Sequence, residues 1–398
     1  MEKVRFGIVG CGNMGTGHSK NFMDGKIANG VITAVCDINP DKFSFFKEKE
    51  KFGDNIKYFT SAEEMFKSGE CDVVIICTPH YFHPELAILA LNNNLNCIVE
   101  KPAGVYTLQV KEMLEVAKKS DKILGIMFNQ RTNPAFKKMR EMVQNGSIGE
   151  VKRTNWIITD WYRTQQYYDS GDWRATWKGE GGGVLYNQAP HQLDLFQWIL
   201  GMTPSKVRAF CHEGKWHDIE VEDDVTAYLE FPNGATGVFI TSTGDTPGSN
   251  RFEVTLDKGK ILAELNETGK HLTVFRSENG MTEQEFSATN QSPFGNMKFV
   301  KEEPDVNAHS GGHPAVLNAF AAHILRGEPL LADGHEGING LTISNAMHLS
   351  SWTGKAVDLA NFDHDLYYEE LMKRVATSRR KENVVNIDPV DMSKTYGA

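Results

Sequence analysis

Short apolar runs alternate with amphipathic stretches along the first third of the chain. The runs consist mostly of Val, Ile and other apolar residues, which predicts β-strands at residues 4–9, 31–36, 73–77, 96–99 and 123–128. Between them lie stretches such as 108–120, where Val110, Met113 and Ala117 recur on one helical face. Strands that are apolar on both faces are typical of a parallel sheet covered by helices on both sides. The pattern therefore predicts a doubly wound α/β domain over residues 1–130.

The alternation of strands and helices stops near residue 131. Antiparallel hairpins are indicated around Asn233-Gly234 and Lys258-Gly259, because turn residues there separate strand-like runs. The remaining predicted elements are helices at 133–144, 184–200, 314–326, 336–353 and 363–375, a long strand at 151–161 and a polar loop at 289–312. We therefore expect a second α/β domain over 131–398, with C-terminal helices that can pack back on the first domain.

Composition and charge narrow the classes of partner. The chain has 398 residues, of which 40% are apolar and 24% charged, as in ordinary globular proteins. Its formal net charge of −10 argues against a nucleic-acid partner, because a polyanion requires a basic surface. No run approaches the roughly 18 to 20 apolar residues of a membrane span, so we expect no membrane partner.

The N-terminus and the cysteines favour a cytoplasmic protein. The chain enters the strand-like residues 4–9 directly, without the pattern of a secretory signal. Its six cysteines show no CxxC spacing and lie mostly in or beside apolar runs, which is typical of reduced, buried thiols. His212 and His217 have no companions at metal-ligand spacing, so we predict no metal site and place both histidines at the surface.

A glycine-rich turn, Gly10-Cys11-Gly12-Asn13-Met14-Gly15, follows the first predicted strand. In such a turn the first glycine permits a tight bend, the second lets the backbone approach a diphosphate, and the third allows close helix packing. Asp37 closes the second predicted strand, where a carboxylate accepts the ribose hydroxyls of NAD and repels the 2′-phosphate of NADP. We therefore predict NAD binding by a Rossmann domain; the alternative is a glycine turn that binds nothing.

Two further motifs follow predicted strands. Thr78-Pro79 with His83 comes after the run 73–77, and Glu100-Lys101-Pro102 comes after 96–99. Ligands gather at the carboxyl ends of parallel strands. An ammonium group at Lys101 would lie where a hydroxyl sheds its proton as a hydride leaves. The alternative is an ordinary surface lysine.

Together with Gly181-Gly182-Gly183 followed by His191 and Asp194, these motifs give the chain a recognisable pattern. The sequence resembles the Gfo/Idh/MocA family, named after glucose–fructose oxidoreductase, inositol dehydrogenase and MocA. The resemblance covers nearly the whole chain, and Glu100-Lys101-Pro102 is its most specific mark. It implies a Rossmann domain followed by an α/β domain with a large open, mostly antiparallel sheet. It also implies NAD(P)-linked redox chemistry on sugars and cyclitols, and a homodimer or homotetramer formed through that sheet.

The resemblance assigns roles residue by residue. Lys101 matches the catalytic lysine that orients the reacting hydroxyl, and His191 matches the general acid/base, a role that suits an imidazole. Arg131 belongs to a segment that matches a loop lining the active site, so we expect it to contact substrate. The glycine turn and the resemblance together predict the following cofactor contacts: Gly10, Gly12, Asn13, Met14, Gly15, Asp37, Thr78, Pro79, His83, Glu100, Lys101, Asn129, Trp173 and Arg174.

One residue departs from the family pattern. Four residues before the histidine the family's dehydrogenases usually carry aspartate, whereas this chain has Asn187. On a continuous helix Asn187 and His191 would share one face. The amide can bind a sugar hydroxyl or the imidazole, but it cannot stabilise an imidazolium by charge. The alternative is that Asn187 caps a helix with Pro190 in its first turn. We expect Asp194 to support the helix or His191.

Aromatic and polar residues crowd the segment 161–177. Rings against a pyranose, with amides and guanidinium groups on its hydroxyls, are a common way to hold a carbohydrate, so Trp161, Tyr162 and Arg163 are predicted substrate contacts. The alternative is a loop that caps the core. His313, after two glycines, is a further candidate.

These features favour an NAD-dependent oxidoreductase that interconverts a secondary alcohol and a ketone on a sugar, glycoside, sugar acid or cyclitol. An alternative is a redox-neutral enzyme with tightly bound NAD, in which a transient ketone permits elimination, epimerisation or glycoside cleavage. Retained NAD and turnover without added cofactor would distinguish the second from the first. A third hypothesis is a non-catalytic NAD-dependent sensor. The presence of both Lys101 and His191 disfavours it.

Overall fold

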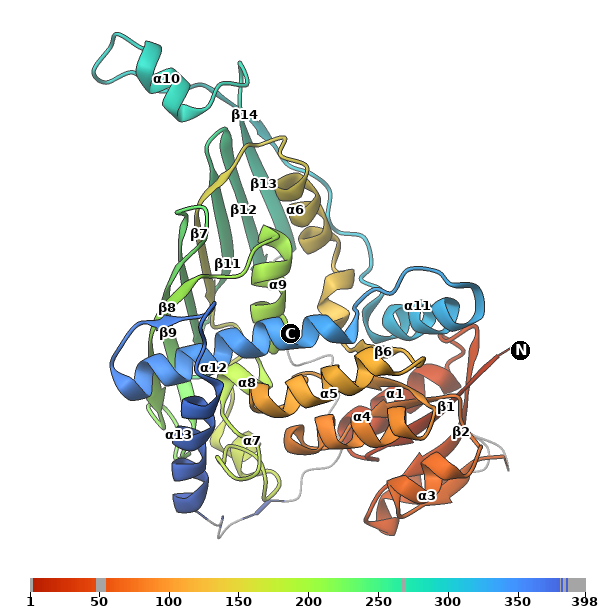
Figure 1. Ribbon diagram of the computed structural model, residues 1–398. Helices are drawn as coiled ribbons and strands as arrows, with labels where there is room; N and C mark the ends of the chain where they lie inside the picture. Colours follow the sequence, from red (N-terminus) through yellow and green to blue (C-terminus); the bar gives the residue numbers. More distant parts are fainter. Residues whose placement is uncertain (1–2, 48–54, 267–268, 380, 382–383, 386–398) are drawn as a thin grey trace.

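The computed structural model describes residues 3–47, 55–266, 269–379, 381 and 384–385. Two β-sheets dominate these residues, and Figure 1 shows them in separate lobes, the first in red and orange and the second in green. Helices from the C-terminal part of the chain lie between and across the lobes.

The first lobe contains a parallel sheet with helices on both faces. Among the described residues it has six strands in the order β3-β2-β1-β4-β5-β6. Their bounds are β1 Val4–Val9, β2 Gly30–Cys36, β3 Lys57–Phe59, β4 Val73–Ile76, β5 Asn96–Val99 and β6 Leu124–Ile126. Because β1 has β2 on one side and β4 on the other, the strand order reverses there, and ligands bind at such a point. The predicted doubly wound fold is confirmed.

The covering helices of this lobe begin where the strands end. They are α1 Asn13–Met23, η1 Pro40–Lys47, α3 Ala62–Lys67, η2 His80–Phe82, α4 His83–Asn92, α5 Thr107–Lys119 and, after β6, η3 Asn129–Thr132. On α5, Val110, Met113 and Ala117 are buried, as their spacing predicted.

The second lobe contains a mixed, mostly antiparallel sheet. Among the described residues its order is β14-β13-β12-β11-β7-β10-β9-β8-β15, and only β7 and β10 pair in parallel. The strands are β7 Val151–Ile158, β8 Lys206–Glu213, β9 Glu222–Glu230, β10 Thr236–Ser242, β11 Asn250–Leu256, β12 Gly259–Asn266, β13 Gly269–Ser277, β14 Phe299–Glu302 and β15 Val357–Asp358. The second sheet that the family resemblance implied is thus present.

Two predictions about single elements are wrong. The predicted loop at 289–312 contains β14, which pairs with β13 at the edge of the sheet. The predicted helix over 184–200 is divided into α8 Val184–Asn187 and α9 Pro190–Leu200. Pro190 explains the break, because a proline lacks the N–H that would continue the hydrogen-bond ladder and is tolerated in a first turn.

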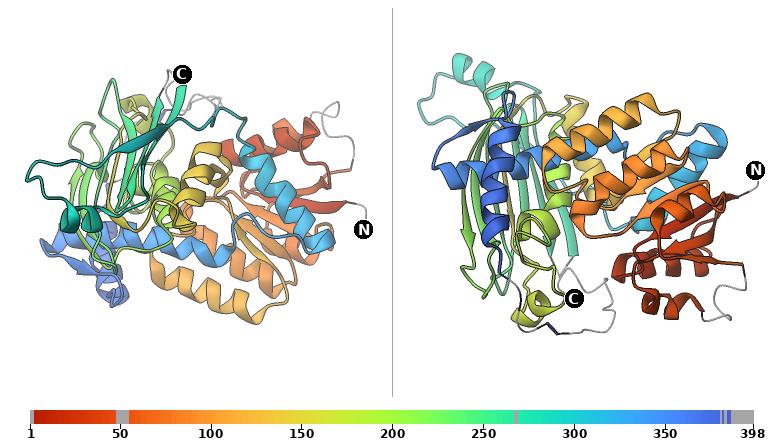
Figure 2. Two further views of the ribbon diagram at one scale, coloured as in Figure 1. Left: turned by 90° about the horizontal axis from the view of Figure 1, so that it is seen from above. Right: turned by 60° about the horizontal axis from the view of Figure 1, so that its bottom comes forward.

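The remaining helices follow β6 in the chain. They are α6 Pro134–Gln144, α7 Gln165–Asp169, α10 Glu283–Thr289, α11 Gly312–Arg326, η4 Gly334–Glu336, α12 Gly337–Thr353 and α13 His364–Thr377. Of these, α11 and α12 contact elements of the first lobe. In both views of Figure 2, α11 lies with the first lobe. Its residues Val316, Leu317 and Phe320 are buried in one cluster with Phe6 and Ile8 of β1.

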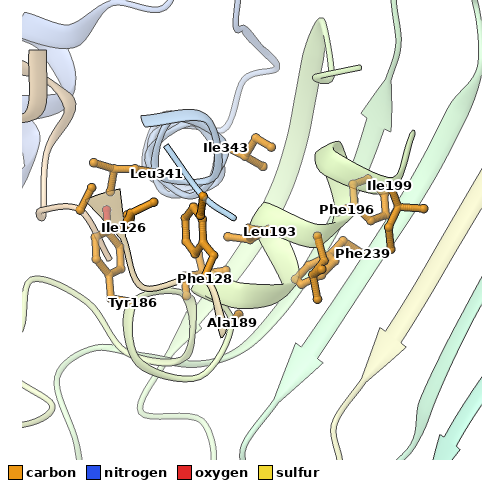
Figure 3. Packing of buried hydrophobic residues seen from close by; sticks show 14 of the residues in the cluster. Ile126, Phe128, Tyr186, Ala189, Leu193, Phe196, Ile199, Phe239, Leu341 and Ile343 are labelled. Carbon is orange, nitrogen blue, oxygen red and sulfur yellow. The ribbon is translucent and has the colours of Figure 1, made fainter. Parts of the chain in front are cut away.

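A continuous apolar core connects α12, α9 and the second sheet. Figure 3 shows Leu341 of α12 beside Ile126, with Phe128 and Leu193 between the helices. Farther along α9, Phe196 lies beside Phe239 of β10. The start of α9 is therefore fixed where the two lobes meet. Among the described residues, no helix is both long and apolar enough to cross a membrane.

Candidate active site

The glycine turn between β1 and α1 has the geometry that a dinucleotide needs. Gly10 has a φ of +92°, and a Cβ there would lie 2.7 Å from the carbonyl oxygen of Cys77. A Cβ at Gly15 would lie 2.0 Å from the carbonyl oxygen of Gly10. At Gly12 a Cβ would meet no atom of the described chain within 4 Å, so the start of α1 is open to a ligand. Asn13 opens α1, whose N-terminal N–H groups can receive a diphosphate.

Asp37 lies directly beside this turn. One carboxylate oxygen, Oδ2, accepts the N–H of Cys11 at 2.8 Å, and Oδ1 accepts the N–H of Asn39 at 2.9 Å. These contacts hold the carboxylate at the carboxyl end of β2, as the sequence led us to expect. The position fits recognition of an adenosine ribose.

Two buried oxygens at the carboxyl ends of the strands are also suited to a ligand. Thr78 Oγ1, after β4, and Asn129 Oδ1, after β6, have no hydrogen-bond partner within the described residues. Leaving buried polar atoms unpaired is costly, which supports a bound polar molecule at this edge of the sheet. The residues present therefore fit a dinucleotide at the topological switch point.

His83 joins two of the loops at this edge. Its Nδ1 lies 2.7 Å from the carbonyl oxygen of Pro102, and its Nε2 lies 2.7 Å from that of Thr78. Pro79 precedes η2 between these contacts. Because both ring nitrogens are engaged by main-chain carbonyls, His83 positions the loops and does not point at a ligand.

Glu100 forms a buried polar cluster with two histidines. His18 Nε2 lies 2.7 Å from Glu100 Oε1, and the ring of His313 lies edge-on to His18 at 5.2 Å. Burial alone raises the pKa of the Glu100 carboxyl, but the hydrogen bond and charge of His18, together with His313 and Lys101, lower it to about 2. The structure thus groups His313 with Glu100. His18 was missed, because nothing in the spacing of α1 distinguishes it from a core histidine.

Lys101 extends from the first lobe to the start of the second. Its Nζ donates a hydrogen bond of 2.9 Å to the main-chain oxygen of Asn187. Burial lowers the pKa of the Lys101 amine, and the charges of Arg174 and Arg163 act in the same direction, whereas Glu100 and Glu180 oppose them. The hydrogen bond therefore holds the amine in place. The ammonium form loses its proton at a lower pH than that of a surface lysine.

His191 lies in the first turn of α9, close to this contact. Its side chain is buried against Phe128, and its Nδ1 has no hydrogen-bond partner within the described residues. Burial lowers the pKa of the imidazole well below its usual value, and the charge of Lys101 lowers it further. His191 is consequently a neutral imidazole with a free ring nitrogen, which is the form that can accept a proton.

Asn187 does not cap α9. The residue before Pro190, Ala189, occupies the N-cap position, and Asn187 is the last residue of α8. Its side-chain Oδ1 accepts the hydroxyl of Tyr167 at 3.0 Å, and its Nδ2 donates to Glu180. The helix-cap alternative is therefore wrong, and Asn187 belongs to a polar cluster beside Lys101.

Arg174 and Trp173 adjoin this cluster. Arg174 Nη1 donates to the hydroxyl of Tyr167 at 2.8 Å, and the guanidinium lies 4.5 Å from the Tyr167 ring and 4.7 Å from the Trp173 ring. The guanidinium of Arg163 also approaches this cluster, 5.2 Å from the Tyr167 ring. Sequence reasoning included Tyr167 only among the aromatic residues of its loop.

Glu180 and Glu222 are two buried carboxylates that sequence reasoning missed. Glu180 is 1% exposed and accepts from Asn187. Glu222 accepts the N–H groups of Gly183 and Leu185 at 2.9 and 3.0 Å, which fixes the glycine run ahead of α8. Glu180 directly precedes the glycine run but is not part of it, and Glu222 stands in no motif, so neither carboxylate was singled out in the sequence.

Arg131 is not available to a substrate, and its predicted role is wrong. Its guanidinium is 1% exposed and forms a two-pronged contact with Asp194 at 2.8 and 2.6 Å. A third contact joins Arg131 to Glu336 at 2.8 Å. A buried guanidinium requires such charged partners, so Asp194 supports Arg131 and not His191. Arg131 thus ties η3 to α9 and η4.

The aromatic segment has a buried part and an exposed part. Trp161 is 1% exposed and packs in the core, which agrees with a core-capping residue and not with a substrate contact. Tyr162, in contrast, is 47% exposed. Arg163 donates to the carbonyl oxygens of both residues. The structure therefore brings Arg163 toward Tyr167 and Lys101, and leaves Trp161 in the core.

Comparisons with known proteins agree with this geometry. Residues 4–128 match the family described as "Oxidoreductase family, NAD-binding Rossmann fold", and residues 136–262 match the GFO/IDH/MocA C-terminal domain. The chain is 27% identical over 364 residues to myo-inositol 2-dehydrogenase of Thermotoga maritima, a match that covers 89% of this chain and 98% of that protein. It is 28% identical over 346 residues to D-glucoside 3-dehydrogenase of Escherichia coli, covering 82% and 90% of the two chains.

A solved structure has the same architecture. The WlbA dehydrogenase of Chromobacterium violaceum, crystallised with NADH and UDP-GlcNAcA, superposes with a TM-score of 0.74 at 25% identity, covering 90% of this chain and 96% of that one. The two matched domains of one family together span more than half of the sequence. The chain therefore belongs to the Gfo/Idh/MocA family of oxidoreductases, and its cofactor is NAD.

Proposed function

We propose that the protein interconverts a secondary alcohol and a ketone on a sugar, glycoside, sugar acid or cyclitol. The observation that carries the proposal is the contact of 2.9 Å between Lys101 Nζ and the main-chain oxygen of Asn187, at the turn that leads into α9 and His191. The charge of Lys101 also lowers the pKa of the His191 imidazole, which supports an arrangement in which the two groups act together. The relatives named as inositol and glucoside dehydrogenases support the substrate class.

When bound, NAD supplies a nicotinamide that accepts or returns the hydride. The ammonium of Lys101 donates a hydrogen bond to the reacting oxygen and holds it in one orientation. His191 takes the proton of the hydroxyl in one direction and returns it in the other. Its lowered pKa keeps the imidazole neutral before the reaction, which leaves a ring nitrogen available for this proton. Arg163 and Arg174, which both approach the Tyr167 ring, are suited to bind the other oxygens of the substrate.

The test is to follow NADH absorbance while the enzyme is offered a panel of sugars, sugar acids and cyclitols with NAD. The wild type should reduce NAD with at least one member, and Lys101→Ala should lower kcat by about 10²- to 10⁴-fold, as loss of an acid–base group does. Lys118→Ala, an exposed lysine on α5, is the matched control and should keep full activity. Equal rates for Lys101→Ala and wild type would contradict the proposal.

A redox-neutral reaction is the second candidate. It is favoured by Asn187, because an amide at this position cannot balance a charged imidazole during net oxidation. In this case the purified protein should retain NAD and convert its substrate without added cofactor and without net change in absorbance. Denaturing the protein and assaying the released dinucleotide separates this candidate from a net dehydrogenase.

We also propose that the protein is a cytoplasmic homodimer or homotetramer that associates through the second sheet. On the face of that sheet turned away from the helices, Ile157, Phe210 and Tyr228 are 38%, 52% and 45% exposed. Apolar residues gathered on one sheet face support an interface. The six cysteines are all unpaired thiols in the described chain, which supports a reducing compartment.

A further inference from the structure

We propose that Glu180 is a positioning residue of this site, which acts on Lys101 in two ways. Through the side chain of Asn187 it holds the carbonyl group that anchors the lysine, and its carboxylate supplies the negative charge that keeps the amine protonated. The inference rests on the proposed function, since it concerns the same lysine. It goes beyond it by assigning a role to a carboxylate that no sequence motif marks.

The surroundings of Glu180 fit a charged carboxylate. The residue is 1% exposed and lies directly before the glycine run. Its Oε2 accepts the N–H of Ala175 at 2.6 Å, and its Oε1 accepts the side-chain N–H of Asn187. Arg174 Nη1 lies 3.8 Å from Oε1. Because both oxygens accept N–H donors, neither needs a proton of its own, although burial raises the pKa of this carboxyl.

A short path of contacts leads from Glu180 to Lys101. Asn187 gives its amide N–H to Glu180 and receives the hydroxyl of Tyr167 on Oδ1, so its side chain has one orientation. The main-chain oxygen of the same residue accepts from Lys101 Nζ at 2.9 Å. Fixing the side chain of Asn187 therefore also fixes the carbonyl to which Lys101 is bound.

The charges around Lys101 leave a distinct part to Glu180. The charged groups that act on the amine are the carboxylates of Glu100 and Glu180 and the guanidinium groups of Arg163 and Arg174. The ammonium in turn lowers the pKa of the imidazoles that face it, which are His80, His83, His191 and His313. Of the two carboxylates, Glu100 is already paired with His18 at 2.7 Å. Glu180 in turn interacts with Arg174, Glu222, Tyr168 and Lys381.

Glu180 is thus the carboxylate that is linked to Lys101 through Asn187. Its charge raises the pKa of the lysine, whereas the charges of two arginines lower it. Removing its charge while keeping its shape should make the Lys101 amine lose its proton at a lower pH. Glu180 raises the pKa of the Lys101 amine, and a neighbouring opposite charge typically shifts a pKa by about one unit.

The experiment measures the titration of Lys101 directly. Apo-protein is labelled briefly with acetic anhydride at a series of pH values, and the peptide that contains Lys101 is quantified by mass spectrometry. In Glu180→Gln the midpoint of labelling should fall by about one pH unit relative to wild type. The matched control is Glu220→Gln. The Glu220 carboxylate accepts the N–H of Trp177, which lies in the same loop as Glu180. This control should leave the midpoint of Lys101 unchanged.

Exchanging the two side chains distinguishes charge from structure. In the double variant Glu180→Gln with Asn187→Asp, the new amide at 180 can donate to the new carboxylate at 187, and Tyr167 can still donate to its other oxygen. The charge stays in the cluster, so the labelling midpoint should return to the wild-type value and kcat should recover at least tenfold over Glu180→Gln. A carboxylate that served only as a hydrogen-bond acceptor would leave the labelling midpoint of Glu180→Gln at the wild-type value.

The outcomes separate this inference from the proposed function. An unchanged midpoint in Glu180→Gln, or an exchanged pair no better than the single variant, overturns the role of Glu180 even if the wild type oxidises a sugar. A shifted midpoint supports it even if no substrate in the panel is oxidised, which would count against the proposed function alone. Should Glu180→Gln fail to fold, the exchanged pair decides: a midpoint at the wild-type value supports the inference, and a lower one overturns it.

Discussion

The carboxylate of Asp37 accepts the N–H of Cys11 and so stands at the rim of the glycine turn. A negative charge there repels a second phosphate on the adenosine ribose, which is why we expect the protein to prefer NAD to NADP. The preference depends on this one side chain, because Asn39 and the backbone around it carry no charge.

Replacing Asp37 by serine should therefore relax the choice of cofactor. We expect the KM for NAD to rise about tenfold, because one charge-assisted hydrogen bond is lost. The KM for NADP should fall. Steady-state kinetics with each dinucleotide measure both effects. Asp41→Asn, an exposed carboxylate on η1, is the control. A serine variant as selective for NAD as the wild type would show that Asp37 does not decide the preference.

Lys101 should impose a pH limit on oxidation. Burial lowers the pKa of its amine below the ordinary value of about 10.4. As the pH rises through this lowered pKa, the ammonium form is lost and the rate should fall. A profile of kcat/KM against pH measures this descending limb. In Lys101→Arg the guanidinium stays charged, so any residual activity should lack the limb. A limb that persists in the arginine variant must come from another group.

At the scale of elements, Arg131 joins three segments that are far apart in the chain. Its contacts with Asp194 and Glu336 hold η3 against α9 and η4. Removing one partner of a buried ion pair leaves the other charge uncompensated. The contact thus stabilises the angle at which α9 carries His191.

We predict that Arg131→Leu lowers the free energy of unfolding by about 3–5 kcal/mol, as the loss of a buried ion-pair partner does. Denaturant unfolding followed by circular dichroism measures the change. Arg153→Leu, an exposed arginine on β7, should have little effect. Adding Asp194→Leu to Arg131→Leu should restore part of the stability, because it removes the uncompensated charge of Asp194. A double variant less stable than Arg131→Leu alone would contradict this explanation.

The elements that the sequence predicted well are those with strong local patterns. The buried strands β1 and β5 have the predicted bounds, because their apolar runs are covered on both faces. The edge strands β3 and β14 escaped detection, since they are short and largely exposed. Within the site, the glycine turn is visible in the sequence, but the partners of Arg131 and the position of Glu180 depend on contacts between distant segments. No spacing rule reports such contacts.

At the scale of the whole molecule, the two lobes share their cores. Phe320 of α11 packs against β6, so that a Cβ at Gly125 would lie 2.7 Å from its ring. The same helix is buried against β1. The first sheet therefore obtains part of its cover from a helix that follows β14 of the second sheet in the chain.

Phe320→Ala should accordingly weaken cofactor binding from a distance. We expect a loss of about 3–5 kcal/mol in stability, typical of a buried phenylalanine, together with a weaker thermal stabilisation by NADH. Thermal unfolding with and without NADH measures both effects. Phe299→Ala, a partly exposed phenylalanine on β14, is the control. Equal melting temperatures for the two variants would show that α11 contributes little to the first lobe.

The open face of the second sheet gives a prediction for assembly. Ile157 and Tyr228 are exposed there, so glutamate at both positions should convert a dimer or tetramer into a monomer. Sedimentation velocity distinguishes these states. Phe294→Glu, at a position 90% exposed outside that sheet, should leave the assembly intact. A wild type that sediments as a monomer would contradict the proposed assembly.

The position of α11 also bears on how the protein is made. A ribosome releases the residues of the first sheet long before it reaches Gly312–Arg326, the helix that covers them. Until then Phe6 and Ile8 of β1 lack their partners on α11, and this side of the cluster is open to water or to a chaperone. A message cut short after the first sheet should consequently yield an aggregation-prone fragment, and not a small nucleotide-binding module that survives by itself.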